Sequence, residues 1–186
     1  MTESLQRKWK KWEQALPVEE VVPRPIVDHP EALESIELHS FGDASKQGVG
    51  AAVYAAVRQK SGTTQRLVVG KGRLAKQGLT IPRLELIGAH MATNLVMNAK
   101  KALEGLPISR ICGWLDSTVV LHWLQGQGEY KQFVQNRVKK IQAHSEISWR
   151  HVGTSENPAD LASRGGRVTE STLSSHMASQ PRKMAT

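Results

Sequence analysis

The chain of 186 residues is predicted to fold as an α/β domain on a mixed five-stranded sheet, three antiparallel strands followed by two parallel ones, flanked by helices. Three consecutive apolar runs joined by short turns predict the antiparallel part. A long segment with apolar residues every three or four positions then predicts a helix. After it, short strands and helices alternate, which is typical of a sheet covered by helices.

The three antiparallel strands come first. Apolar and polar residues alternate from Ile36 to Asp43, which predicts the first strand. Residues 48–59 form an apolar run rich in small and β-branched residues, and residues 65–75 form another. Residues 60–63, Lys-Ser-Gly-Thr, have the composition of a hairpin turn between these two strands.

The helical part begins at Thr80, which is expected to cap a helix with Pro82 in its first turn. Its apolar spacing continues to Leu103, and Pro107 ends it. The remaining elements are predicted as a strand at 109–116, helices at 118–125 and about 129–143, a strand at 147–152, and a last helix at 157–164 with Pro158 near its first position.

The N-terminal segment is predicted to be an amphipathic helix, because Leu5, Trp9, Trp12 and Leu16 recur at steps of four, three and four. Prolines between residues 17 and 30 indicate an extended linker after it. We therefore divide the chain into a helix and linker (1–35), a domain (36–165) and a Gly-, Ser- and Thr-rich tail expected to be disordered (166–186).

Composition excludes several classes of protein. The single cysteine excludes a disulfide scaffold and a cysteine-cluster zinc site. The sequence has neither a signal peptide nor an apolar stretch of transmembrane length. We therefore expect an intracellular protein of the cytoplasm or nucleus that does not enter a membrane.

The charge is unevenly distributed, with a net −3 over residues 1–42 and +11 over residues 43–186. A strongly basic body favours a polyanionic partner such as nucleic acid. The alternative is a basic surface with no such partner.

Four acidic residues stand at special positions. Asp43 and Asp116 end predicted strands, and Glu85 and Asp160 lie in the first turns of predicted helices. Hard divalent cations prefer oxygen ligands, and two such ions can promote in-line phosphoryl displacement. The alternative is that helix-start acids only favour the helix dipole.

The stretches LHSFGDASKQGVGAAVY, IPRLELIGAHMA, GWLDSTVVLHWL and WRHVGTSENPADLASRG resemble the ribonuclease H domain of BEL/Pao-type long-terminal-repeat retrotransposons. The resemblance covers about residues 36–165. It implies the ribonuclease H-like fold, and it implies that Asp43, Glu85, Asp116 and Asp160 are catalytic and bind two Mg²⁺ ions, with Mn²⁺ as a substitute. It further implies a hydrolase, an endonuclease that cleaves the RNA strand of RNA–DNA hybrids.

Further residues are candidates for contacts with the hybrid, either because they follow the acids or because they are basic. These are Ser45, Ser117, Thr118, Lys131, Arg137 and Lys140. The segment with Trp9 and Trp12 looks like the end of the family's connection to reverse transcriptase. The two rings are expected either to pack on the domain or to contact a reverse transcriptase domain.

The sequence departs from the family pattern in two places. Many ribonucleases H have a histidine in the loop before the last aspartate, but Thr154 falls near that position here, and His151 lies just upstream. The segment after Gly165 does not resemble the family's continuation, so we expect an isolated or truncated reading frame.

The sequence leaves other functions to compare with this one. The strongest alternative is a catalytically silent, nucleic-acid-binding or scaffolding module of the same fold. An integrase or transposase would place a glutamate last, whereas here Glu85 precedes Asp116. An aspartic protease is disfavoured because no glycine follows Asp43 or Asp116, as that enzyme's turn requires, and because the long helix around Glu85 does not fit an all-β protease.

Overall fold

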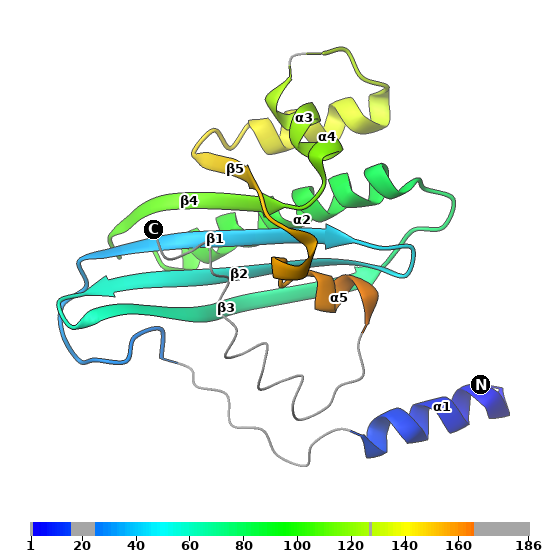
Figure 1. Ribbon diagram of the computed structural model, residues 1–186, viewed down its shortest axis with the longest axis horizontal. Coiled ribbons are helices and arrows are strands. Elements are labelled where there is room, and N and C mark those ends of the chain that lie inside the picture. Colours follow the sequence, from blue (N-terminus) through cyan, green and yellow to red (C-terminus); the bar gives the residue numbers. More distant parts are fainter. Residues whose placement is uncertain (1, 16–24, 127, 166–186) are drawn as a thin grey trace.

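The computed structural model describes residues 2–15, 25–126 and 128–165 (Figure 1). The strands are β1 (Ser35–Ala44), β2 (Gly48–Gln59), β3 (Gly62–Leu74), β4 (Ile108–Leu115) and β5 (Ile147–His151). The helices are α1 (Glu3–Gln14), α2 (Ile81–Ala102), α3 (Thr118–Gln125), α4 (Gln132–Gln142) and α5 (Asp160–Arg164), with a 3-10 turn η1 (Thr154–Glu156).

The five strands form one sheet in the order β3-β2-β1-β4-β5. Strands β1, β2 and β3 pair antiparallel, while β4 pairs parallel with both β1 and β5. The predicted fold class, with three antiparallel strands followed by two parallel ones, is confirmed.

Strand β1 is the centre of the sheet and is covered on both sides. Helix α2 lies against one face, and the short helix α5 lies against the other (Figure 1). Every residue from Leu38 to Ala44 is consequently buried, although the sequence alternates apolar and polar residues as if one face met solvent. The polar residues of this alternation are therefore held inside the protein.

Glycines let α5 approach the sheet closely. A Cβ atom at Gly50 would lie 2.5 Å from the carbonyl oxygen of Ala159, and one at Gly48 would lie 2.7 Å from that of Ser163. A side chain at either position would force the helix away from the sheet, so these two glycines of β2 determine how near α5 comes to that strand.

The largest apolar contact lies between the sheet and α2. Side chains of β1 and β2, among them Leu38 and Val53, pack with Val96 of α2 and Ile111 of β4. Burial of such side chains contributes about 1.5–3 kcal/mol each. This core holds α2 rigidly along the sheet and so fixes the position of its N-terminal turns.

One predicted helix start is confirmed in position, and another is shifted. Thr80 occupies the N-cap position of α2, but its side chain makes no capping hydrogen bond. The last helix begins at Asp160 rather than near residue 157, because the Asn157 side chain accepts a hydrogen bond from the backbone N–H of Ala159 and forms a turn instead.

The expected linker lies partly outside the described residues. Its described end, from residue 25, packs on the sheet through Ile26 and Val27, and Asp28 forms an ion pair with Arg66 of β3. The expected disordered tail lies outside the described residues. No helix in the described part of the chain combines the length and apolar character needed to cross a membrane.

Candidate active site

The first two acids are brought together by a glycine contact between β1 and α2. A Cβ atom at Gly42 would lie 2.8 Å from the carbonyl oxygen of Gly88, and a Cβ at Gly88 would lie 2.8 Å from that of Asp43. Only glycine allows this approach. Because Glu85 lies one helical turn before Gly88, its side chain starts close to the end of β1.

Asp43 lies near the end of β1 and is 4% exposed. Since Gly42 contacts α2, the alternation of side chains along the strand directs Asp43 to the opposite face, toward α5. There its carboxylate accepts a hydrogen bond from the hydroxyl of Ser163. Burial raises the pKa of the Asp43 carboxyl above its ordinary value, the Ser163 hydrogen bond lowers it, and the charges of Asp116 and Asp160 raise it.

Glu85 is half-buried near the start of α2, and its carboxylate accepts a hydrogen bond of 2.6 Å from the hydroxyl of Ser117. The same hydroxyl accepts a hydrogen bond from the backbone N–H of Val120 and so caps α3. Burial raises the pKa of Glu85, the Ser117 hydrogen bond lowers it, and the charges of Asp116 and Asp43 raise it. One serine thus connects this acid to the start of α3.

Asp116 directly follows β4, and its side chain is half-buried. Strands β1 and β4 are parallel, and Gly42 pairs with Leu115. Asp43 and Asp116 therefore lie at the carboxyl ends of neighbouring strands, at the same end of the sheet.

Asp160 is the first residue of α5 and forms an ion pair with Arg164 of the same helix. Two hydrogen bonds hold this region against β1. The Asn157 amide donates to the carbonyl oxygen of Gly42 at 3.1 Å, and the Ser45 hydroxyl donates to that of Ser163 at 2.6 Å. The last acid is thus positioned by contacts with residues 115 and 118 positions away in the chain.

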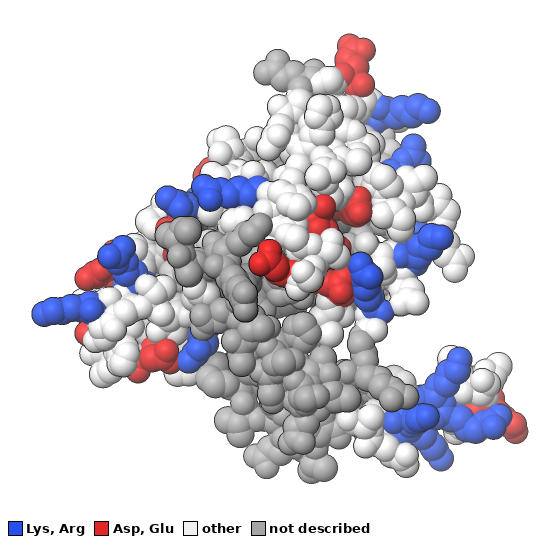
Figure 2. Space-filling model, in the orientation of Figure 1, with Lys and Arg blue, Asp and Glu red and all other residues white. Residues whose placement is uncertain are grey.

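The four acids come from four elements and lie at one end of the sheet, where their charges act on one another. Figure 2 shows acidic side chains near the centre of the face that carries α5, with basic side chains beside them. This is the arrangement expected of a site for divalent cations or for phosphate chemistry.

The oxygen ligands of this cluster fit Mg²⁺, a hard cation. Such a cation would stabilise the charged forms of Asp43 and Glu85, because it would neutralise the repulsion that helps to raise their pKa values. The side chains of the described residues do not form a complete metal site, however. Within residues 2–15, 25–126 and 128–165, no three His, Cys, Asp or Glu side chains are grouped closely enough to hold a metal ion. Instead, Ser163 donates a hydrogen bond to the Asp43 carboxylate, and Arg164 forms an ion pair with the Asp160 carboxylate.

The candidate nucleic-acid residues fall into two groups. Ser45 and Ser117 use their hydroxyls within the protein, in the turn after β1 and at the start of α3. Thr118, Lys131 and Lys140 are exposed on α3 and α4 or just before α4. Their contact with nucleic acid stays a prediction.

Arg137 is the most organised of these candidates. Its guanidinium lies 3.7 Å from the ring centroid of Phe133 and donates a 3.0 Å hydrogen bond to the Phe133 carbonyl oxygen. Arg83 of α2 approaches the same ring at 5.4 Å. The ring thus holds two guanidinium groups near the start of α2, the helix that carries Glu85.

Two residues that position the acids were not predicted from the sequence. Ser163 lies three positions after Asp160 and binds Asp43, and Asn157 precedes a proline and joins the turn before α5 to β1. The Asn-Pro pair is a turn signal that could have identified Asn157. Ser163 had no local signal, because its partner is 120 positions away.

The two residues near the missing loop histidine are both exposed. His151 ends β5, and Thr154 begins η1. No described contact links either of them to the four acids, so their roles remain predictions.

Comparison with known proteins identifies one matching family. Residues 1–117 match the model of the Pao retrotransposon-like RNaseH-like domain. Asp43, Glu85 and Asp116 fall within the match, and Asp160 lies beyond it. No curated protein matches the chain.

Solved structures of similar fold include several ribonucleases H. RNase H1 from the archaeon Halobacterium salinarum NRC-1 is 17% identical, with a TM-score of 0.44 over 70% of this chain and 95% of that chain. LC11-RNase H1 in complex with an RNA/DNA hybrid is 14% identical, with a TM-score of 0.47 over 74% and 99%. The protease–reverse transcriptase of prototype foamy virus is 14% identical, with a TM-score of 0.44 over 77% and 22%.

Proposed function

The chain belongs to the family of Pao retrotransposon-like RNaseH-like domains, and we propose that it is an endonuclease that cleaves the RNA strand of RNA–DNA hybrids. One observation carries the proposal. Asp43, Glu85, Asp116 and Asp160 leave four different elements at one end of the sheet, and their charges act on one another.

We propose that these four carboxylates hold two Mg²⁺ ions, with Mn²⁺ as a substitute. Bound there, the ions would supply an activated water and stabilise the leaving oxygen of the phosphodiester. The protein's own contribution is to hold the carboxylates. Ser163 orients Asp43, and Ser117 orients Glu85. Arg164 neutralises Asp160 and must release it when a cation binds.

The hybrid is proposed to lie across the acids and the neighbouring basic side chains of α4. Arg137, held on the Phe133 ring, is preorganised to meet a phosphate, because its side chain loses little freedom on binding. Thr118 at the start of α3, Lys131 just before α4 and Lys140 in α4 are exposed and are proposed as further phosphate contacts.

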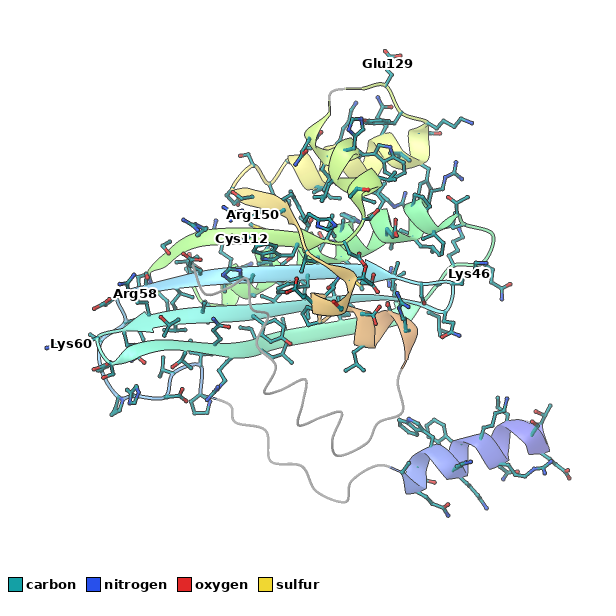
Figure 3. All side chains as sticks on the ribbon, viewed as in Figure 1. Lys46, Arg58, Lys60, Cys112, Glu129 and Arg150 are labelled. Atoms are coloured by element: carbon teal, nitrogen blue, oxygen red, sulfur yellow. The ribbon has the colours of Figure 1, made fainter. Side chains whose placement is uncertain are left out.

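The decisive experiment incubates the purified chain with a labelled RNA–DNA hybrid in Mg²⁺, with EDTA and with duplex DNA as controls. The proposal expects cutting of the RNA strand only, and only with a divalent cation, because the 2′-hydroxyl distinguishes the two strands. Glu85→Gln should reduce cutting to background. Glu129→Gln is a matched control, because Glu129 is exposed in the segment before α4 (Figure 3).

Equal cutting of duplex DNA, or full activity of Glu85→Gln, would contradict the proposal. Hybrid affinity should also fall as salt increases, because phosphate contacts release counterions. An affinity independent of salt would argue against phosphate contacts on the basic surface.

A second candidate is a catalytically silent module that binds nucleic acid. It is favoured by the absence, among the described residues, of three acidic side chains grouped for a metal ion. Such a module would bind the hybrid, yet the cleavage assay would show no product in Mg²⁺ or Mn²⁺.

We also propose that the apolar face of α1 contacts a reverse transcriptase domain. The rings of Trp9 and Trp12 lie 5.0 Å apart and are 55% and 46% exposed, and no residue of α1 is buried. Exposed paired tryptophans are typical of contact surfaces. Replacing both by Ala should abolish binding to a reverse transcriptase domain of the same element, and unchanged binding would contradict this role.

A further inference from the structure

A cavity of about 200 Å³ lies between β3 and α2, apart from the four acids. Its polar rim is formed by Lys71, Arg73, His90 and Asn94, and its apolar wall includes Met91 and Leu95. The cavity therefore combines cations, hydrogen-bonding groups and an apolar surface in one small space.

The two cations of β3 reach this cavity because of strand alternation. Gly72 faces α5, since a Cβ there would lie 3.3 Å from the carbonyl oxygen of Ala162. Its neighbours Lys71 and Arg73 consequently point to the other face of the sheet, where α2 lies. Both are exposed, and neither forms an ion pair or hydrogen bond with any of the described residues.

The surroundings of the cavity are positive. Burial lowers the pKa of His90, and the charges of Lys140, Arg137, Arg73 and His144 lower it further. The charges that act on this imidazole are thus positive, and they come from β3 and from α4 and the segment just after it. Unpaired cations grouped in this way repel one another, and an anion would relieve the repulsion.

The cavity does not belong to the cleavage site. Asn94 follows Glu85 by nine positions in α2, which is two and a half helical turns, so the two side chains leave opposite sides of the helix about 14 Å apart along its axis. A ligand in the cavity would therefore not be the phosphodiester at the four acids.

We propose that this cavity, with Lys71 and Arg73 at its rim, is a second nucleic-acid site that takes the sugar–phosphate backbone of a single strand. The cations meet phosphates, and the Asn94 amide and His90 ring offer hydrogen bonds to a sugar or base edge. At about 200 Å³ the cavity has room for a phosphate group and its sugar, which is a small part of one strand. A strand held here would add to the affinity of a hybrid with a single-stranded extension, because the second contact becomes intramolecular.

Binding of a labelled single strand to the full chain, measured by fluorescence anisotropy in EDTA, tests the site separately from cleavage. Lys71→Glu with Arg73→Glu should weaken binding about tenfold or more and reduce the salt slope by about 1.4, two contacts at 0.7 each. The matched control is Arg58→Glu with Lys60→Glu. Both side chains are exposed and lie together at the β2–β3 hairpin end of the sheet, away from the rim (Figure 3).

A variant expected to bind more tightly controls for misfolding. Asn94→Arg adds a cation to the rim and should tighten binding of the single strand, an effect that damage to the fold cannot produce. Equal losses in the rim pair and the control pair, or no gain with Asn94→Arg, would overturn the proposal.

Competitors and the cleavage assay separate the remaining outcomes. At matched ionic strength, inorganic phosphate should not displace the strand; displacement would identify a site for a free anion and overturn the proposal. The rim pair should still cut a blunt hybrid at the wild-type rate if both proposals hold. If the wild-type chain does not cut the hybrid, only the proposed nuclease activity is refuted. The strand site would still be supported by the binding data.

Discussion

Ser163 of α5 donates a hydrogen bond to the buried carboxylate of Asp43, 120 positions earlier in the chain. The carbonyl oxygen of the same residue accepts the hydroxyl of Ser45, two positions beyond Asp43. The last helix is therefore joined twice to the end of the central strand. This contact brings the element that carries Asp160 to the other acids.

Ser163→Ala should destabilise the domain and slow cleavage. It leaves a buried carboxylate without its donor, which costs about 1–3 kcal/mol in the free energy of unfolding. Loss of such a supporting contact typically lowers metal affinity or activity about 10- to 100-fold. Urea unfolding and the Mg²⁺ dependence of cleavage measure the two effects. Ser155→Ala, at an exposed position of η1, is the control.

The loss should depend on pH, because the Ser163 hydroxyl stabilises the charged form of Asp43. The missing donor should cost most at high pH, where the carboxylate is charged, and less at low pH, where the raised pKa keeps the carboxyl protonated. Conservative replacement by Thr, which keeps the hydroxyl, should restore the Mg²⁺ dependence. Equal destabilisation at both pH values would show that Ser163 acts only through packing.

Without metal, the domain should lose stability as the pH rises from about 4 toward neutrality. The pKa values of Asp43 and Glu85 are raised in the folded protein, mainly by burial. The folded state therefore keeps protons that the unfolded chain has already released, so the free energy of unfolding falls with rising pH. Melting temperatures in EDTA across this range test the sign, and the double variant Asp43→Asn with Glu85→Gln should flatten the curve.

Divalent cations should reverse this loss at neutral pH. If the proposed site binds cations, they bind the native protein and not the unfolded chain, so they should raise the melting temperature by mass action. The shift with Mg²⁺ should be absent from the Asp43→Asn and Glu85→Gln double variant. A shift of the same size in that variant would place the cation elsewhere.

Asp116→Asn should abolish cleavage while leaving the metal-free fold as stable as wild type or more so. The change removes one negative charge whose repulsion raises the pKa values of Asp43 and Glu85. Hybrid binding should survive, because phosphate contacts come mainly from Lys and Arg. A variant that melts well below wild type in EDTA, or cuts at near the wild-type rate, would make Asp116 a structural residue.

Thr154→His should raise the cleavage rate, because many ribonucleases H carry a histidine at that place in the loop. His151→Ala should change the rate little, since the ring is exposed at the end of β5 and has no described contact with the acids. A loss of about a hundredfold with His151→Ala, the size of a general acid–base contribution, would show that His151 performs that role.

Much of the fold was predictable because its signals are local. The turn at residues 60–63, the helical spacing after Thr80 and the apolar strand before Asp116 each depend on neighbours within a few positions. The four acids were also identifiable from sequence, because each stands at the boundary of an element. Their grouping at one end of the sheet follows from the parallel pairing of β1 and β4 and from the start of α2.

Tertiary structure decided what surrounds those acids. The contact of Gly42 with Gly88, the bond from Ser163 to Asp43 and the bond from Asn157 to Gly42 join residues far apart in the chain. No periodicity or propensity carries such information, because these contacts form only when packed layers bring distant backbones within a few ångströms. The same holds for the cavity between Lys71 and Asn94, which exists only because β3 and α2 lie side by side in the folded domain.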